Sequence, residues 1–202
     1  MITLESVAKS FGSVEVLTNL SLNLESSMSH CIIGRSGCGK STLLKMMALI
    51  AKPDKGKITI NGTDVTLLNE QECEKFRNQT ISYSFQEPLL IPYMTSLENI
   101  TEVLGIDKDM AIRELSRLGL SKRLDHLPSK LSVGEKKRVD IARAILKGSS
   151  ILIADEPLSN LDPASSLMVM ELLRAHANNG GSVIYSAVEP TDGKFADNIV
   201  NL

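Results

Sequence analysis

The clearest chemical signal in the sequence is a glycine-rich loop. It contains Gly34, Arg35, Ser36, Gly37, Cys38, Gly39, Lys40, Ser41 and Thr42. These residues fill every fixed position of a P-loop, in which backbone N–H groups converge on phosphate oxygens. We expect Lys40 to reach the β- and γ-phosphates, Ser41 to ligate Mg²⁺ and Thr42 to contact the α-phosphate of a nucleotide. A glycine turn with a purely structural role is the alternative, and the complete pattern disfavours it.

Two adjacent carboxylates form the second signal. Asp155 and Glu156 directly follow the apolar segment 151–154. Buried strands of an open sheet deliver the residues at their carboxyl ends to the ligand crevice. We therefore expect Asp155 to hold Mg²⁺ and Glu156 to polarise an attacking water. The alternative is a solvated acidic turn, which an upstream phosphate-binding loop makes less favourable.

Three further motifs occur in an order typical of one family. Residues 131–135 read Leu-Ser-Val-Gly-Glu, Gln86 follows the alternating segment 81–85, and residues 159–162 read Ser-Asn-Leu-Asp after Pro157. Together with the glycine loop they resemble the signature motif, Q-loop and D-loop of the ATP-binding cassette (ABC) ATPases. The resemblance covers essentially the whole chain.

The resemblance implies roles for residues that spacing alone does not explain. Phe11 is placed to stack on adenine, and Gln86 to contact Mg²⁺ and assist catalysis. Ser132 and Gly134 are placed at a helix N-terminus, which favours an anion. In the family this motif covers the γ-phosphate bound by a second subunit, so two cassettes enclose two ATP molecules. The implied cofactors are ATP and Mg²⁺.

The segment after Gln86 bears on the membrane partner. Leu89, Leu90 and Ile91 lie between two prolines, Pro88 and Pro92. In the family this region forms the groove that receives a helix of the permease, whereas ordinary packing against a helical insertion explains the same apolar residues equally well. The resemblance implies an ATPase at the cytoplasmic face of the membrane, peripherally bound to transmembrane permease subunits.

The amino-acid sequence of the Q-loop region most resembles that of importer cassettes for nitrate-, sulfonate- or thiamine-precursor-like solutes. We therefore expect an importer subunit. Two alternatives remain, namely a lipoprotein- or peptide-exporter-type cassette, and a non-transport or regulatory ABC ATPase that acts on a protein or nucleic acid. Lys and Arg total 22 against 24 Asp and Glu, a formal net charge of −2. That balance argues against a nucleic-acid partner.

The chain departs from the family pattern at two positions. Val188 stands where the family has its switch histidine, and a valine cannot hydrogen-bond a phosphate. Val133 replaces a signature glycine, which restricts the backbone there. We expect ATP binding with weak hydrolysis. Ser186 is expected to face away from the site.

The remaining patterns predict an α/β protein whose strand–helix alternation favours a parallel sheet. We expect one domain, 1–202, with a core and an N-terminal antiparallel β subdomain in 1–86 and 131–202, and a helical subdomain at about 87–130. Strands are predicted at 20–24, 28–33, 58–60, 81–85, 151–154, 182–186 and 198–202. Helices are predicted at 43–49, 96–120, 133–147 and 163–178. Residues 136–138 are expected to form a solvated helix face. Three cysteines without metal-ligand spacing favour a reduced, cytosolic setting.

Overall fold

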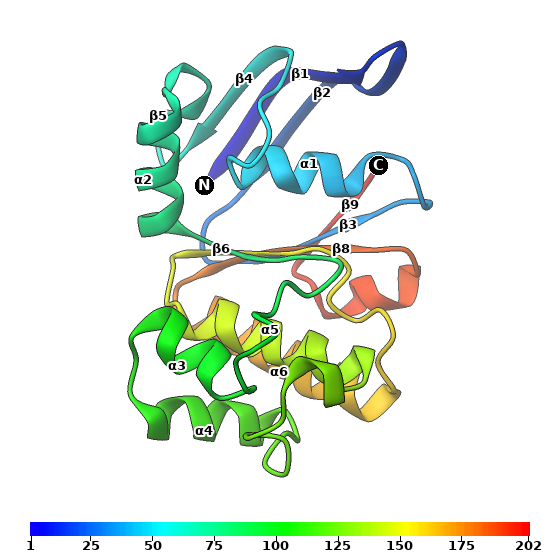
Figure 1. Ribbon diagram of the computed structural model, residues 1–202. Helices are drawn as coiled ribbons and strands as arrows, with labels where there is room; N and C mark the ends of the chain where they lie inside the picture. Colours follow the sequence, from blue (N-terminus) through cyan, green and yellow to red (C-terminus); the bar gives the residue numbers. More distant parts are fainter.

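Two β-sheets of different type organise the chain, and the computed structural model describes every residue from Met1 to Leu202 (Figure 1). The first sheet is antiparallel, with the strand order β2-β1-β4-β5. Its strands are β1 (Ile2–Phe11), β2 (Val14–Leu24), β4 (Lys55–Ile60) and β5 (Thr63–Asp64). Asn61 and Gly62 join β4 to β5 with positive φ at both residues. This is the tight turn that their sequence predicts.

The second sheet is parallel and has five strands in the order β6-β7-β8-β3-β9. Its strands are β3 (Ser29–Ile33), β6 (Ile81–Ser84), β7 (Ile151–Ala154), β8 (Ser182–Ala187) and β9 (Asn198–Asn201). The central strand β8 is buried along its whole length. Because β7 and β3 flank it, the segments that follow these two strands meet at the same edge of the sheet. The predicted α/β class is confirmed.

Helix α1 (Lys40–Met47) lies between the two sheets (Figure 1). Its apolar side chains Leu43, Leu44, Met46 and Met47 are fully buried in a core that strands of both sheets share. The core is filled by aliphatic and methionine side chains, as expected from a chain without tryptophan. Helix α2 (Glu70–Thr80) leads into the edge strand β6.

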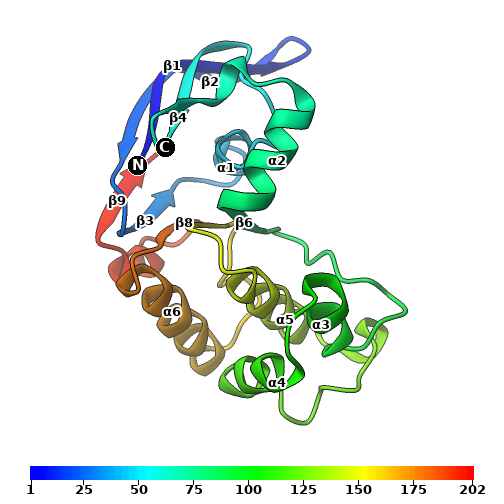
Figure 2. The same ribbon diagram turned by 90° about the vertical axis from the view of Figure 1, so that its left-hand side faces the viewer.

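The opposite face of the parallel sheet is covered by α5 (Val133–Leu146) and α6 (Pro163–Asn178), as Figure 2 shows from the side. Helix α5 begins at a capping box between Ser132 and Glu135. Gly148, just beyond its end, has a φ of +70°, the left-handed conformation that commonly ends a helix. Both boundaries agree with the sequence-based prediction.

The helical region predicted at 96–120 is two helices rather than one. Helices α3 (Glu98–Leu104) and α4 (Lys108–Arg117) both pack against α5. Gly105 ends α3 in the left-handed conformation, and the Asp107 carboxylate caps α4 by accepting hydrogen bonds from the N–H groups of Asp109 and Met110. The chain therefore turns between the helices, which the continuous apolar periodicity did not reveal.

Short 3₁₀ segments lie at Val65–Leu67, Pro128–Lys130 and Pro190–Phe195. None of the helices combines the length and the hydropathy needed to span a membrane.

Burial of α1 between the sheets predicts a strong effect of truncating its core face. Leu44→Ala removes a fully buried side chain, and such changes lower the free energy of unfolding by about 2–5 kcal/mol. Denaturant titration of the full chain measures the loss. The matched control is Leu67→Ala, at a side chain that is 81% exposed, where we expect a change within about 0.5 kcal/mol. Equal effects of the two substitutions would contradict the described packing.

Candidate functional site

The glycine loop joins β3 to α1 and leaves the N-terminus of α1 ready for an anion. Gly37 and Gly39 have φ values of +80° and +103°, which side-chain-bearing residues rarely adopt. No side chain caps α1, and its first turn holds no acidic residue, whereas α2, α4, α5 and α6 are all capped by side chains. The free N–H groups and the helix dipole thus favour a phosphate. The residues at the tip of the loop, 35–37, are exposed.

Lys40 is the buried positive charge of this loop. Its side chain is 4% exposed, and its Nζ donates hydrogen bonds to the carbonyl oxygens of Gly34 at 2.8 Å and Arg35 at 3.2 Å. It also lies 3.7 Å from Oε1 of Glu156. The structure therefore brings the predicted phosphate-binding lysine and the predicted catalytic carboxylate into one site.

Asp155 and Glu156 follow β7 at the same edge of the sheet as the loop. Asp155 is 2% exposed. Glu156 has a φ of +45°, an unusual conformation for a residue with a side chain that often marks functional sites. Its Oε2 accepts a hydrogen bond from Nε2 of Gln86 at 3.1 Å. Gln86 thus joins Lys40 and Glu156, although the three are far apart in sequence.

Ser186 points into this site, and the expectation that it faces elsewhere is wrong. Its Oγ donates to Oδ1 of Asp155 at 2.7 Å and accepts from the backbone N–H of Glu156 at 2.8 Å. The reason is the two-residue period of a strand. Ser186 shares the face of β8 with Ile184, whose side chain belongs to the core around α1. The hydroxyl holds both acidic residues in place.

Val188 lies just beyond β8, beside Glu156. The two line a cavity of about 250 Å³ together with Ser186, Glu189 and Asp192. Val188 is 41% exposed and has no polar side-chain atom for the reacting groups. Burial and the nearby Glu189 carboxylate raise the pKa of Asp192. The cavity therefore contains no cation or imidazole that replaces the switch histidine.

The signature segment forms the N-terminus of α5, where Ser132 and Val133 are exposed whereas Leu131 and Gly134 are buried. Ser132 and Glu135 exchange hydrogen bonds, and Arg123 lies 2.7 Å from the Glu135 carboxylate. The bond from the Ser132 backbone N–H, followed by the Arg123 guanidinium, lowers the pKa of Glu135. A Cβ at Gly134 would lie 2.9 Å from the carbonyl oxygen of Asn160, so the close approach to the predicted D-loop requires glycine. Val133 is 56% exposed.

Phe11 ends β1, with 56% of its surface exposed and the Lys9 ammonium 5.5 Å from its ring centroid. The adjoining strand β2 approaches the glycine loop, since a Cβ at Gly39 would lie about 3.0 Å from the Val16 and Leu17 side chains. The exposed aromatic ring of Phe11, on a strand paired with β2, fits an adenine-stacking role, which remains a prediction.

Residues 136–138 do not form a solvated face, contrary to expectation. Lys137 is 1% exposed, and burial lowers its pKa. Its Nζ donates to the carbonyl oxygens of Phe85 at 3.1 Å and Gln86 at 2.5 Å. Arg138 bonds the Ser165 hydroxyl on α6, and Lys136 is half-buried. The sequence did not reveal these contacts, because the partners of Lys137 and Arg138 are distant in sequence.

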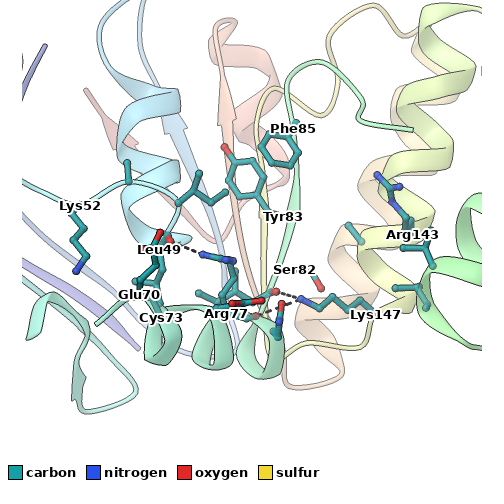
Figure 3. Close-up of a pocket in the computed structure, with 18 residues that line it drawn as sticks. Leu49, Lys52, Glu70, Cys73, Arg77, Ser82, Tyr83, Phe85, Arg143 and Lys147 are labelled. Atoms are coloured by element: carbon teal, nitrogen blue, oxygen red, sulfur yellow. Dashed lines mark hydrogen bonds between the residues drawn. The ribbon is translucent and has the colours of Figure 1, made fainter. Parts of the chain in front are cut away.

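A large groove lies between α2, β6, α3 and α5, with a volume of about 950 Å³ (Figure 3). Arg77, Tyr83, Phe85, Arg143 and Lys147 are among the residues that line it. For the apolar run 89–91, the sequence left open a surface for the permease or ordinary internal packing, and the structure differs from residue to residue. Leu89 is 58% exposed, whereas Leu90 packs against the main core. Asn99 fixes the backbone of Ile91 through both its N–H and its carbonyl.

The fold and the site together define a class, a P-loop ATPase cassette. Residues 17–159 match the model of the family described as "ABC transporter". The chain is 40% identical to the lipoprotein-releasing system ATP-binding protein LolD of Bacteroides thetaiotaomicron over 80% of this chain and 78% of LolD. It is 37% identical to the macrolide export ATP-binding/permease protein MacB of Brucella melitensis over the whole chain, which spans 33% of MacB.

A solved structure is similar over the whole chain. It is a dimeric post-hydrolysis state of the ATP-binding cassette MJ0796 bound to ADP and Pi, with a TM-score of 0.93 and 29% identity. The alignment covers 100% of this chain and 94% of that one. The chain belongs to the ABC transporter family and is an ATP-binding ATPase of that family. The relatives give no support to the importer expectation and favour the exporter-type alternative.

The position of Lys40 predicts its effect on nucleotide binding. Lys40→Ala removes the buried ammonium from the loop, and loss of a charged hydrogen bond worth about 1.5–3 kcal/mol lowers ATP affinity by about 10- to 100-fold or more. Equilibrium titration with a fluorescent ATP analogue measures the affinity. Lys45→Ala on the same helix, whose side chain forms none of the polar contacts of the loop, should leave it unchanged. Retained affinity in Lys40→Ala would remove the phosphate-site assignment.

Proposed function

We propose that this ATPase is the energy-coupling subunit of an exporter-type ABC transporter and acts with a membrane-embedded permease. The observation that carries the proposal is the meeting of Lys40, Gln86 and Glu156 beside an uncapped helix N-terminus. The names of the relatives, a lipoprotein-releasing system and a macrolide exporter, support the export direction.

The available donor set suits Mg²⁺. Magnesium prefers oxygen ligands, and the Ser41 hydroxyl, the Gln86 amide oxygen and the Asp155 carboxylate supply them. When bound, Mg²⁺ neutralises charge on the β- and γ-phosphates. Ser186 holds the Asp155 carboxylate in its orientation, with Oδ1 already engaged. Ser41, Asp155 and Gln86 are therefore the residues that would hold the ion.

Hydrolysis requires Glu156 to orient the attacking water. Here Glu156 is shared between Lys40 and Gln86. A bound γ-phosphate competes for the Lys40 ammonium, because a phosphate is a stronger acceptor than the backbone carbonyls that Lys40 now contacts. Glu156 is thereby released toward the water. The hydrogen bond from the Glu156 backbone N–H to Ser186 keeps the carboxylate close to the phosphate during this change.

The exposure of Ser132 at the N-terminus of α5 supports a dimer in which the signature segment, with Ser132 and Gly134, faces the nucleotide of a second ATPase subunit. Ser132 forms no hydrogen bond with the glycine loop of its own chain. The dimeric state of the similar cassette MJ0796 supports the same arrangement. ATP then acts as the contact that closes the two cassettes.

The groove between α2, β6, α3 and α5 is the proposed docking site for the permease. It adjoins the Q-loop through Phe85, so a docked helix lies next to the catalytic glutamine. Docking at this groove would hold the cassette peripherally at the cytoplasmic face of the membrane.

The groove predicts a separable effect on assembly. Val103→Asp places a charge at a 43% exposed residue that lines the groove, and the tagged full chain should then lose a permease from detergent-solubilised membranes while ATP affinity stays unchanged. Mass spectrometry identifies the partner. Leu67→Asp, at a highly exposed side chain outside the groove, is the control and should retain it. Retention by both variants would exclude docking at this groove.

Val188 predicts slow turnover. Val188→His supplies a donor beside Glu156, and regaining such a contact raises kcat by about 10²-fold or more. Radiolabelled ATP measures the rate, and Val188→Leu, which restores no donor, should match the wild type. A wild-type rate equal to that of Val188→His would contradict the proposed role of this position.

A further inference from the structure

Cationic side chains of α5 and of Lys147, the residue that caps its C-terminus, reach backbone carbonyls around β6 and the loop that follows it. Lys137 contacts Phe85 and Gln86, Arg143 donates to the Leu89 carbonyl at 2.6 Å, and Lys147 donates to the Ile81 carbonyl at 2.6 Å. Figure 3 shows Arg143 on α5, and Lys147 extending toward this segment from just beyond the end of α5. Hydrogen bonds from these three side chains therefore hold segment 81–89 against α5 and its C-terminal end.

Of these three side chains, Lys137 lies nearest to Gln86 and Asp155. Its Nζ lies 2.5 Å from the Gln86 carbonyl and 3.5 Å from the Asp155 carbonyl. No backbone N–H donates to the carbonyl of Phe85 or of Gln86. Lys137 therefore supplies the hydrogen bonds that connect these two carbonyl groups to the rest of the protein.

The cost of burying Lys137 indicates that its position matters. A fully buried ammonium loses its hydration, which is a large unfavourable term. Three backbone carbonyls and the negative charges of Asp140, Asp155 and Glu156 compensate for it. A half-exposed lysine on the same helix, such as Lys136, needs no such environment. The groups that stabilise the buried ammonium lie where the backbones of Gln86 and Asp155 approach each other.

We propose that Lys137 is a positioning residue for ATP hydrolysis. By holding the Gln86 carbonyl, it fixes the backbone from which the Gln86 side chain reaches Oε2 of Glu156 at 3.1 Å. Without that anchor the loop 85–87 is free to shift, and a displacement of about 1 Å in a catalytic group can cost about 10²-fold in rate. This inference rests on the proposed function and adds to it a residue outside the predicted motifs.

The test compares Lys137→Met with Lys136→Met in the full chain, using radiolabelled ATP for kcat and KM and a fluorescent analogue for ATP affinity. Lys137→Met is expected to lower kcat by about tenfold or more while ATP affinity and KM stay within twofold of the wild-type values. Lys136→Met, one residue away, should match the wild type. If thermal denaturation shows that Lys137→Met does not fold, Lys137→Gln replaces it as the deciding variant.

A double-mutant cycle separates positioning from a merely structural role. In a Gln86→Ala background there is no glutamine side chain to position, so the Lys137 substitution should change kcat by less than twofold. An unchanged kcat in the single variant, or an equal loss in both backgrounds, would overturn the proposal. The proposed function fails separately, because wild-type protein that neither binds nor hydrolyses ATP would refute it whatever Lys137 does.

Discussion

A buried ammonium at the start of α1 is the interaction on which the site depends. Lys40 is held by the carbonyls of its own loop and by Glu156, at a helix terminus whose N–H groups are uncapped. Positive charge and free donors thus gather where no protein group fully satisfies them. This is the electrostatic condition for an incoming triphosphate, and the glycines that permit the loop geometry are part of the same requirement.

The parallel sheet gives that ammonium its partners. Strand β8 lies between β3, which carries the loop, and β7, which carries Asp155 and Glu156. Its period places Ser186 against both acidic residues. The third partner, Gln86, arrives from the edge strand β6. The site is therefore a product of strand order as much as of residue identity.

The sequence predicted the parts of this arrangement that depend on local pattern. The glycine loop, the strand before Asp155 and the caps of α5 follow from spacing and residue type. No bounds were predicted for strand β1, and helix α2 was not predicted. Bulges interrupt the alternation of β1, and Ser6 has a positive φ there, while α2 is polar with Cys73 as its one buried residue. Ser186 and Lys137 could not be placed, because their partners are distant in sequence and only the tertiary fold brings them together.

The groove beside β6 has a consequence for how signals pass through the domain. Phe85, Arg143 and Lys147 line it. Arg143, Lys147 and the Phe85 carbonyl also take part in the hydrogen bonds that hold segment 81–89 to α5 and its C-terminal end. An occupant of the groove therefore touches these attachments directly. A movement of the occupant can therefore shift segment 81–89, which carries Gln86, through a single side chain. No displacement of the hydrophobic core is needed.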